Sequence, residues 1–320
     1  MTTVTSRPAC QQGRSLRRLS MALAAMILTG CRGQPPQPPK VKPPAGTITV
    51  TDQQGHTLTL AHLPERIISI APSNTELLFA LGLGHHLIAV TSDCNYPPEA
   101  AAKEKIGDFK PSIERIAALA PDLVVAVRDL QPDTIRKLSE ATMPVLVLDP
   151  YTWDRLYQAT EILGQATGAE AAARKLVAEM KAQREQVLAK TKGLRDDQRP
   201  KVFVEISNQP LMAAGPGTFV DELIKDAGGR NVAAGAKVEW AQFSPEAVVQ
   251  ADPDFILTTF EGDAMYVKKR AGWQSVSAVR KGQVYELDPD LLLRPGPRLL
   301  QGLQRTFALL HPELAEAGHR

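Results

Sequence analysis

Apolar residues in this chain gather into short continuous runs that are bounded by Pro, Asp or Gly. In the first half these runs are 66–70, 87–90, 123–126 and 145–148, and in the second half they are 201–206, 255–259 and 284–287. An alternating segment, 47–60, precedes them and predicts an edge hairpin. Continuous apolar runs interleaved with helical segments are typical of parallel strands that helices cover on both faces. The pattern therefore predicts two groups of buried strands.

A long segment without glycine or proline, 169–192, separates the two groups. Alanine, lysine, arginine, glutamate and glutamine dominate it, and these residues favour helix. Its apolar positions fall on one helical face: Ala169, Ala173, Leu176, Met180 and Val187. Thr167 and Glu170 have the spacing of a capping box, so we expect a new helix to begin there. This helix would connect the two halves of the chain.

Two segments of the first half recur in the second half, in the same order. Segment 112–125 reappears as 244–257 and keeps a serine, a glutamate and a Pro-Asp pair at the same offsets. Segment 76–82 reappears as 222–228, and each copy reads as a short helix closed by glycine. We therefore predict an α/β fold of two similar lobes with parallel-type sheets, bridged by one long rigid helix.

The N-terminus has the features of an export signal. Three arginines, the last of them Arg18, precede an apolar stretch from Leu19 to Gly30 that is too short to span a bilayer. The stretch ends in Leu-Thr-Gly-Cys31, which resembles the bacterial lipoprotein signal, in which the cysteine is acylated. A plain cleaved signal is the alternative. We predict an exported lipoprotein, anchored to a membrane in the periplasm or at the cell surface.

These features divide the chain into five parts. We predict a lipoprotein signal peptide at 1–30, a Pro-rich tether at 31–46, an N-terminal α/β lobe at 47–151, a helical linker at 152–198 and a C-terminal α/β lobe at 199–320. The tether prediction depends on six prolines between Arg32 and Gly46, which favour an extended chain.

Charge and motifs argue against several classes of function. The formal net charge is +2, and loss of the four arginines in positions 1–30 leaves −2, so no basic field for nucleic acid is present. The chain has no G-x-S-x-G elbow, no H-E-x-x-H motif and no phosphate-binding glycine loop. Its histidines lack metal-ligand spacing. Once Cys10 is removed and Cys31 acylated, Cys94 has no partner for a disulfide.

Ligands of parallel α/β lobes collect beyond the carboxyl ends of the strands. The loops at those ends, and the residues just before the repeated helices, hold an unusual share of the chain's few aromatic residues together with several polar groups. The candidate ligand-binding residues are Ser73, Asn74, Asn95, Tyr96, Phe109, Trp240, Phe243, Asp290 and Arg294.

Several of these segments resemble one known family. Segments 66–82, 95–98 and 219–229 are similar to those of the periplasmic binding proteins that feed ABC importers for iron–siderophores, haem and vitamin B12. The likeness extends from about residue 47 to 310. It implies a non-enzymatic monomer that has no cofactor or metal site of its own, captures a small molecule between its lobes and delivers it to transmembrane permease subunits.

Within that family the chain looks most like the cobalamin-binding branch. Tyr96, Phe109, Trp240, Asp290 and Arg294 match positions that line its corrinoid pocket, although Phe109 stands where that branch has a tryptophan. A corrin is broad, largely apolar and ringed by amides, so aromatic walls and a few hydrogen-bonding groups suit it. A catecholate siderophore favours an arginine cluster, and haem favours an axial histidine or tyrosine. We therefore rank cobalamin first, a ferric siderophore second and haem third.

Glu114 and Glu246 begin the two repeated helices. The resemblance implies that such glutamates meet arginines of the two permease subunits, and the alternative is that each is simply a favourable acid at a helix N-terminus. Two other classes remain open from the residues alone: an enzyme of similar two-lobed architecture, and a lipid-tethered scaffold without a ligand.

Overall fold

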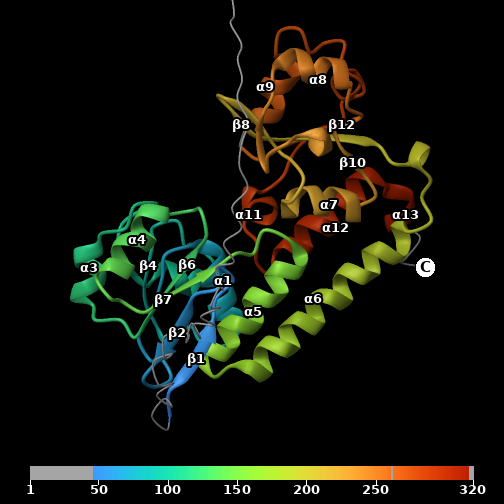
Figure 1. The fold of residues 1–320 in the computed structure, drawn as a ribbon. Helices are drawn as coiled ribbons and strands as arrows, with labels where there is room; N and C mark the ends of the chain where they lie inside the picture. Colours follow the sequence, from blue (N-terminus) through green and yellow to red (C-terminus); the bar gives the residue numbers. More distant parts are fainter. Residues whose placement is uncertain (1–45, 261, 317–320) are drawn as a thin grey trace, which may run out of the picture. The chain divides into compact units, whose positions relative to one another are not determined.

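The computed structural model describes residues 46–260 and 262–316, and the strands of the first half form one five-stranded parallel sheet (Figure 1). Its strand order is β5-β4-β3-β6-β7, with β3 at Ile67–Ser69, β4 at Leu87–Val90, β5 at Glu104–Lys105, β6 at Leu123–Val127 and β7 at Val145–Leu148. The helices of this lobe are α1 (Pro72–Ala80), α2 (Pro98–Ala101), α3 (Ile113–Ala118) and α4 (Pro132–Glu140). Alternate residues of β6 belong to two different apolar clusters, so both faces of the sheet are covered, as predicted.

The second sheet is mixed rather than wholly parallel. Its order is β11-β9-β8-β12-β13, and β10 also pairs with β8. The strands are β8 (Lys201–Asn208), β9 (Leu211–Ala214), β10 (Arg230–Asn231), β11 (Trp240–Gln242), β12 (Phe255–Thr258) and β13 (Val284–Glu286). β9 and β11 are antiparallel to their neighbours, because a two-residue connection such as the one between β8 and β9 can only join antiparallel strands.

The C-terminal lobe carries mostly short helices. They are α7 (Phe219–Asp226), α8 (Pro245–Ala251), α9 (Asp263–Lys269), α10 (Ser277–Arg280), α11 (Pro289–Leu292), α12 (Leu299–Leu310) and α13 (Pro312–Glu316), with 3₁₀ turns at Asp196–Gln198 and Val232–Gly235. A separate hairpin, β1 (Ile48–Thr51) with β2 (Thr57–Leu60), confirms the predicted edge hairpin and packs against the linker. The two lobes with separate sheets confirm the predicted fold class.

Two long helices, α5 (Trp153–Thr167) and α6 (Glu170–Thr191), connect the lobes and pack side by side (Figure 1). The capping box predicted for α6 is wrong. Thr167 ends α5, and its hydroxyl donates to the carbonyl oxygen of Leu163 at 2.7 Å, while Ala169 caps α6 without a side-chain bond. Gly168, with φ of 72°, makes the turn between the helices, which glycine adopts without strain.

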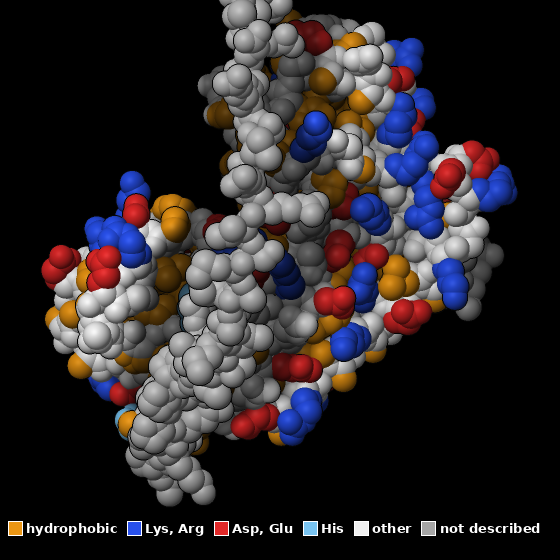
Figure 2. All heavy atoms as spheres, viewed as in Figure 1, with side chains coloured by type: hydrophobic (Ala, Val, Ile, Leu, Met, Phe, Trp, Pro, Cys, Tyr) orange, Lys and Arg blue, Asp and Glu red, His pale blue; other side chains and the backbone are white. Residues whose placement is uncertain are grey.

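Helix α6 links the apolar interiors of both lobes. Its buried Val177, Met180 and Val187 belong to one core cluster that also includes Leu77 of α1 and Leu223 of α7. On its outer side, acidic and basic side chains alternate without a field of one sign (Figure 2). Among the described residues no helix combines the length and the apolar character needed to cross a membrane.

The internal repeat appears in the hydrogen bonding. A glycine of positive φ follows the C-cap residue of each repeated helix, with φ of +79° at Gly82 and +83° at Gly228. Ser112 and Ser244 each accept a bond from the backbone N–H three residues later, which caps α3 and α8. Asp122 likewise ties the start of β3 to β6, as Asp254 ties β8 to β12.

Candidate functional site

A cavity of about 300 Å³ lies between the carboxyl ends of the first sheet and the α11 segment of the second lobe. Ile70, Val127 and Tyr151 reach it because each lies at or just after the end of a strand of the first sheet. The α11 side supplies Asp290, Leu293 and Arg294. The other lining residues are Pro72, Ser73, Thr91, Asp93, Phe109, Leu130, Gln131, Pro289 and Pro295. This is the place that parallel-sheet topology predicts for a ligand.

Tyr151 anchors the aromatic side of the cavity. Its ring is nearly parallel to Phe219, with ring centroids 6.4 Å apart, and meets Trp240 edge-on at 6.3 Å. Its hydroxyl donates to the carbonyl oxygen of Arg128 at 3.1 Å. Burial raises the pKa of Tyr151 to about 12, so the phenol stays neutral at physiological pH.

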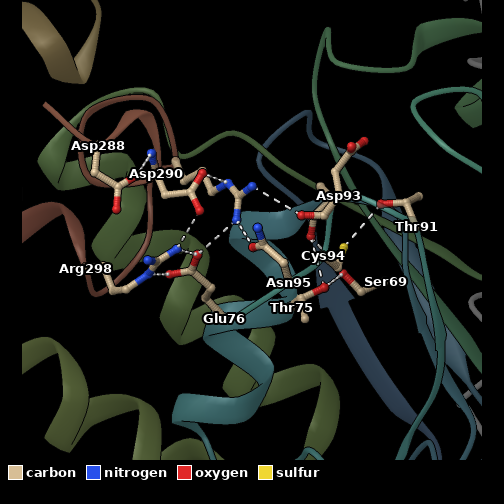
Figure 3. A network of polar contacts seen from close by, with 12 residues as sticks. Ser69, Thr75, Glu76, Thr91, Asp93, Cys94, Asn95, Asp288, Asp290 and Arg298 are labelled. Atoms are coloured by element: carbon tan, nitrogen blue, oxygen red, sulfur yellow. Dashed lines mark hydrogen bonds and ion pairs between the residues drawn. The ribbon is translucent and has the colours of Figure 1, made fainter. Parts of the chain in front are cut away.

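Four side chains of opposite charge meet at the lobe junction, and we call Glu76, Asp290, Arg294 and Arg298 the charged cluster. Figure 3 labels Glu76, Asp290 and Arg298 of this cluster. Arg298 binds both carboxylate oxygens of Glu76, at 2.6 and 2.9 Å. Asp290 lies 2.8 Å from Arg294 and 3.4 Å from Arg298. Each arginine therefore already has a carboxylate partner from within the protein.

Electrostatics of the cluster follow from its burial. Burial raises the pKa of Glu76 above its ordinary value, and the hydrogen bonds from Arg298 oppose that shift. Those same bonds to Glu76 raise the pKa of Arg298, which stays charged. The bidentate geometry is the strong form of the arginine–carboxylate pair.

The structure brings some predicted site residues together and sets others apart. Ser73, Phe109, Asp290 and Arg294 line the cavity. Asn95 does not line the cavity, but its side-chain oxygen accepts a bond at 2.6 Å from Arg294, which does.

Two predicted aromatic residues, Trp240 and Tyr96, lie next to the cavity without lining it. Trp240 contacts Tyr151 rather than the cavity itself. Tyr96 lines a neighbouring cavity of about 500 Å³, and the Arg298 guanidinium carbon lies 4.0 Å from its ring centroid.

Asn74 and Phe243 do not reach the cavity. Asn74 is fully buried within α1, and its side-chain amide has no hydrogen-bond partner among the described residues. Phe243 packs against Phe203, with ring centroids 5.7 Å apart, in a separate apolar cluster of the second lobe.

Several residues at the site were absent from the sequence-based candidates. Tyr151 and Gln131 follow strand ends, so their loops were the available signal. No sequence signal pointed to the pairing of Glu76 with Arg298, because they lie 222 positions apart and only folding makes them neighbours. Across 46–260 and 262–316, no three His, Cys, Asp or Glu side chains are placed to hold a metal ion. Cys94 is buried and unpaired within the described residues, and burial raises the pKa of its thiol.

Glu114 and Glu246 are both exposed in the first turns of α3 and α8. The Ser112 hydroxyl donates to Glu114 at 2.9 Å. Hydrogen bonds from its own backbone N–H and from Ser112 lower the pKa of Glu114, so it stays ionised. The signal peptide, Cys31 and all but the last residue of the tether lie outside the described residues.

Comparison with known proteins gives consistent matches. The family model described as periplasmic binding protein matches residues 67–291. An uncharacterized ABC transporter substrate-binding lipoprotein of Bacillus subtilis, YvrC, is 35% identical over 302 residues, covering 92% of this chain and 96% of that protein. A vitamin B12-binding protein of Pectobacterium atrosepticum is 31% identical over 258 residues, covering 78% of this chain and 89% of that protein. The apo structure of the haem-binding protein RhuT from a Roseiflexus species aligns with a TM-score of 0.69 at 29% identity, covering 78% of this chain and 99% of that one.

Proposed function

This chain belongs to the periplasmic binding protein family, and we propose that it captures cobalamin as the substrate-binding component of an ABC importer. Its role is binding and delivery rather than catalysis: it takes up a small molecule and presents it to permease subunits. The vitamin B12-binding relative supports cobalamin as the ligand, whereas the haem-binding structural neighbour keeps haem as the competing candidate.

One observation carries the choice of cobalamin: the cavity joins apolar and aromatic walls to an arginine, Arg294, whose charge Asp290 already compensates. Phe109, Tyr151 and Leu293 offer flat or apolar surface, which suits a corrin ring. Asp290 and Arg294 offer an acceptor and a donor for the corrin's side-chain amides. Since cobalamin exceeds 300 Å³, part of it would lie in the open mouth of the cavity.

A ferric catecholate siderophore fits this site less well. Its concentrated negative charge calls for several unpaired cations. Arg294 is the cationic residue that lines the cavity in the described chain, and it is held by Asp290, while Asp93 adds a further carboxylate to the wall. An anionic chelate would therefore have to compete with carboxylates of the protein.

Haem is also disfavoured by the groups at hand. Tyr151 is a poor axial ligand, because its raised pKa keeps the phenol protonated and its hydroxyl already donates to Arg128. Tyr96 carries the Arg298 guanidinium over its ring and lines the neighbouring cavity. The lining residues of the 300 Å³ cavity include no histidine.

Delivery would use the exposed glutamates at the tips of the two lobes. Glu114 and Glu246 occupy equivalent first turns and are free to meet basic groups of the permease. Acylation of Cys31, with the Pro-rich segment as tether, would keep the exported protein near the membrane.

The ligand is tested by calorimetric titration with cyanocobalamin, ferric siderophores and haemin in parallel. We expect cyanocobalamin to bind most tightly. The exposed Lys175→Ala variant on α6 serves as a control and should bind as the wild type does. Tight haemin or siderophore binding without measurable cobalamin binding would overturn the ligand and leave the importer role standing.

A further inference from the structure

Glu76 lies beside the ligand site: it lines the neighbouring 500 Å³ cavity but not the 300 Å³ cavity. It lies on α1, and its side chain is 2% exposed. Both arginines that face it come from the other lobe: Arg298 binds it bidentately, and Arg294 lies 3.8 Å away. Of these two arginines, Arg294 reaches the 300 Å³ cavity. Arg294 therefore links Glu76 to the cavity wall.

The charged cluster balances two carboxylates against two guanidiniums. Without the Glu76 charge, Arg294 and Arg298 would share Asp290 as their carboxylate within the cluster. The cluster would then carry a net positive charge at the cavity wall. Charge at a partly buried site acts more strongly than in water, because the surroundings screen it less.

We propose that Glu76 is a specificity-determining residue: its carboxylate keeps the cluster neutral and so favours a net-neutral, amide-rich ligand over an anionic metal chelate. This inference rests on the proposed function and names the property of the ligand that the site selects. Cyanocobalamin is net neutral, whereas haemin and ferric catecholates carry negative charge. Removing the Glu76 charge should favour the second class by attraction to the uncovered guanidiniums.

A purely structural role predicts a different result. The Glu76–Arg298 pair also joins the two lobes, so its loss could weaken binding by loosening their contact. That effect would lower the affinity for every ligand by a similar factor. Charge selection predicts instead that Glu76→Gln lowers the affinity for the neutral ligand relative to the anionic ligands.

The internal repeat supplies a matched control. Glu222 holds the corresponding place on α7, is half-buried, and accepts a bond from the Trp153 backbone N–H at 2.7 Å. It does not line the 300 Å³ cavity. Glu222→Gln therefore removes a comparable charge while leaving the charged cluster unchanged.

The experiment measures affinities for cyanocobalamin, haemin and a ferric catecholate in mildly alkaline buffer. Four variants are compared with the wild type: Glu76→Gln, Arg298→Gln, the double variant that carries both, and Glu222→Gln. Thermal unfolding establishes that each is folded. Arg298→Gln carries the opposite charge change, so the test does not depend on Glu76→Gln folding.

We expect Glu76→Gln to lower the cobalamin-to-haemin affinity ratio by about tenfold or more. Arg298→Gln should raise the ratio, the double variant should return it towards the wild-type value, and Glu222→Gln should leave it unchanged. If wild-type protein binds cobalamin but Glu76→Gln and Arg298→Gln leave the ratio unchanged, the inference is overturned and the proposed function stands. If wild-type protein does not bind cobalamin, the proposed ligand itself fails.

Discussion

Glu76 and Glu222 hold corresponding positions on the repeated helices α1 and α7, and each carboxylate binds a group outside its own lobe. Glu76 binds Arg298 at the start of α12, and Glu222 accepts a bond from the first residue of α5, Trp153. The helical turns that follow them are alike, because Leu81 bonds back to Leu77 as Ala227 does to Leu223. The repeat thus places an acid where each lobe meets the rest of the molecule, buried at Glu76 and half-buried at Glu222.

We expect only small closure of the lobes when ligand binds. Helix α6 shares one apolar core with both lobes, and the Glu76–Arg298 pair joins them directly, so a hinge motion would break buried contacts. Small-angle scattering with and without cyanocobalamin should give nearly the same radius of gyration. A large ligand-dependent decrease would contradict this expectation.

Trp240→Ala should weaken cobalamin binding by about 30-fold, equal to about 2 kcal/mol, through lost support of the Tyr151 ring rather than through a direct contact with the ligand. The loss reaches the ligand through Tyr151, because Trp240 packs edge-on against the Tyr151 ring at the cavity wall. Asp290→Ala should cost about 1–3 kcal/mol, since it leaves a hydrogen-bonding partner unsatisfied. Calorimetric titration measures both losses, with Lys175→Ala as the control. Equal affinity for Trp240→Ala and wild type would count against Tyr151 as a ligand wall.

Reversal of Glu114 and Glu246 to lysine should abolish transport and leave ligand affinity intact. Both side chains are exposed on first turns and stay clear of the cavity, so the effect arises from like-charge repulsion at the permease. Uptake of labelled cobalamin by cells measures the first outcome, and titration of the purified variant measures the second. Normal uptake by the double variant would rule out the docking role.

Tyr151 should make stability fall at alkaline pH. Its folded-state pKa of about 12 lies above the ordinary value of 10.0, because burial disfavours the phenolate. The stability that the neutral phenol contributes is present below pH 10 and is lost as the pH rises through about 12. The unfolding free energy of wild type should therefore fall relative to Tyr151→Phe across that window. If the difference in unfolding free energy between wild type and Tyr151→Phe were the same at about pH 10 and about pH 12, the raised pKa of Tyr151 would be contradicted.

Gly302→Ala should disturb the site from a distance. An added Cβ would overlap the carbonyl oxygen of Leu291 in α11, the helix that carries Asp290. Alanine gains about 1 kcal/mol of helix propensity over glycine, but overpacking against backbone costs about 1–3 kcal/mol. We expect lower stability and weaker cobalamin binding. Gly193→Ala, where nothing lies within 4 Å, is the control and should change neither by a comparable amount.

Local patterns account for what could be predicted from the sequence. Continuous apolar runs predicted β3, β4, β6 and β7 of the first sheet and β8, β12 and β13 of the second, but not β5, β9, β10 and β11. The repeated Ser-x-Glu and Pro-Asp motifs predicted two similar lobes, because caps and strand ends depend on residues near in sequence. The capping box predicted at Thr167 was wrong because packing between two helices, which is not a local pattern, decided where α5 ends. Close packing of Gly164 against Ala173 lets α5 and α6 run together, and Gly168 makes the turn that Thr167 was expected to cap.

The sequence by itself determined the lobes, the long connecting helix and the loops from which a ligand site would be built, because period, turns and strand ends are local properties. It located Ser73, Asp290 and Arg294 in those loops and Phe109 just before a repeated helix, and the fold brings all four to one cavity. Only the tertiary structure decided that Trp240 stands behind Tyr151 and that Phe243 faces another core. Only it paired Glu76 with Arg298, since a contact across 222 positions depends on how the lobes pack and leaves no local pattern.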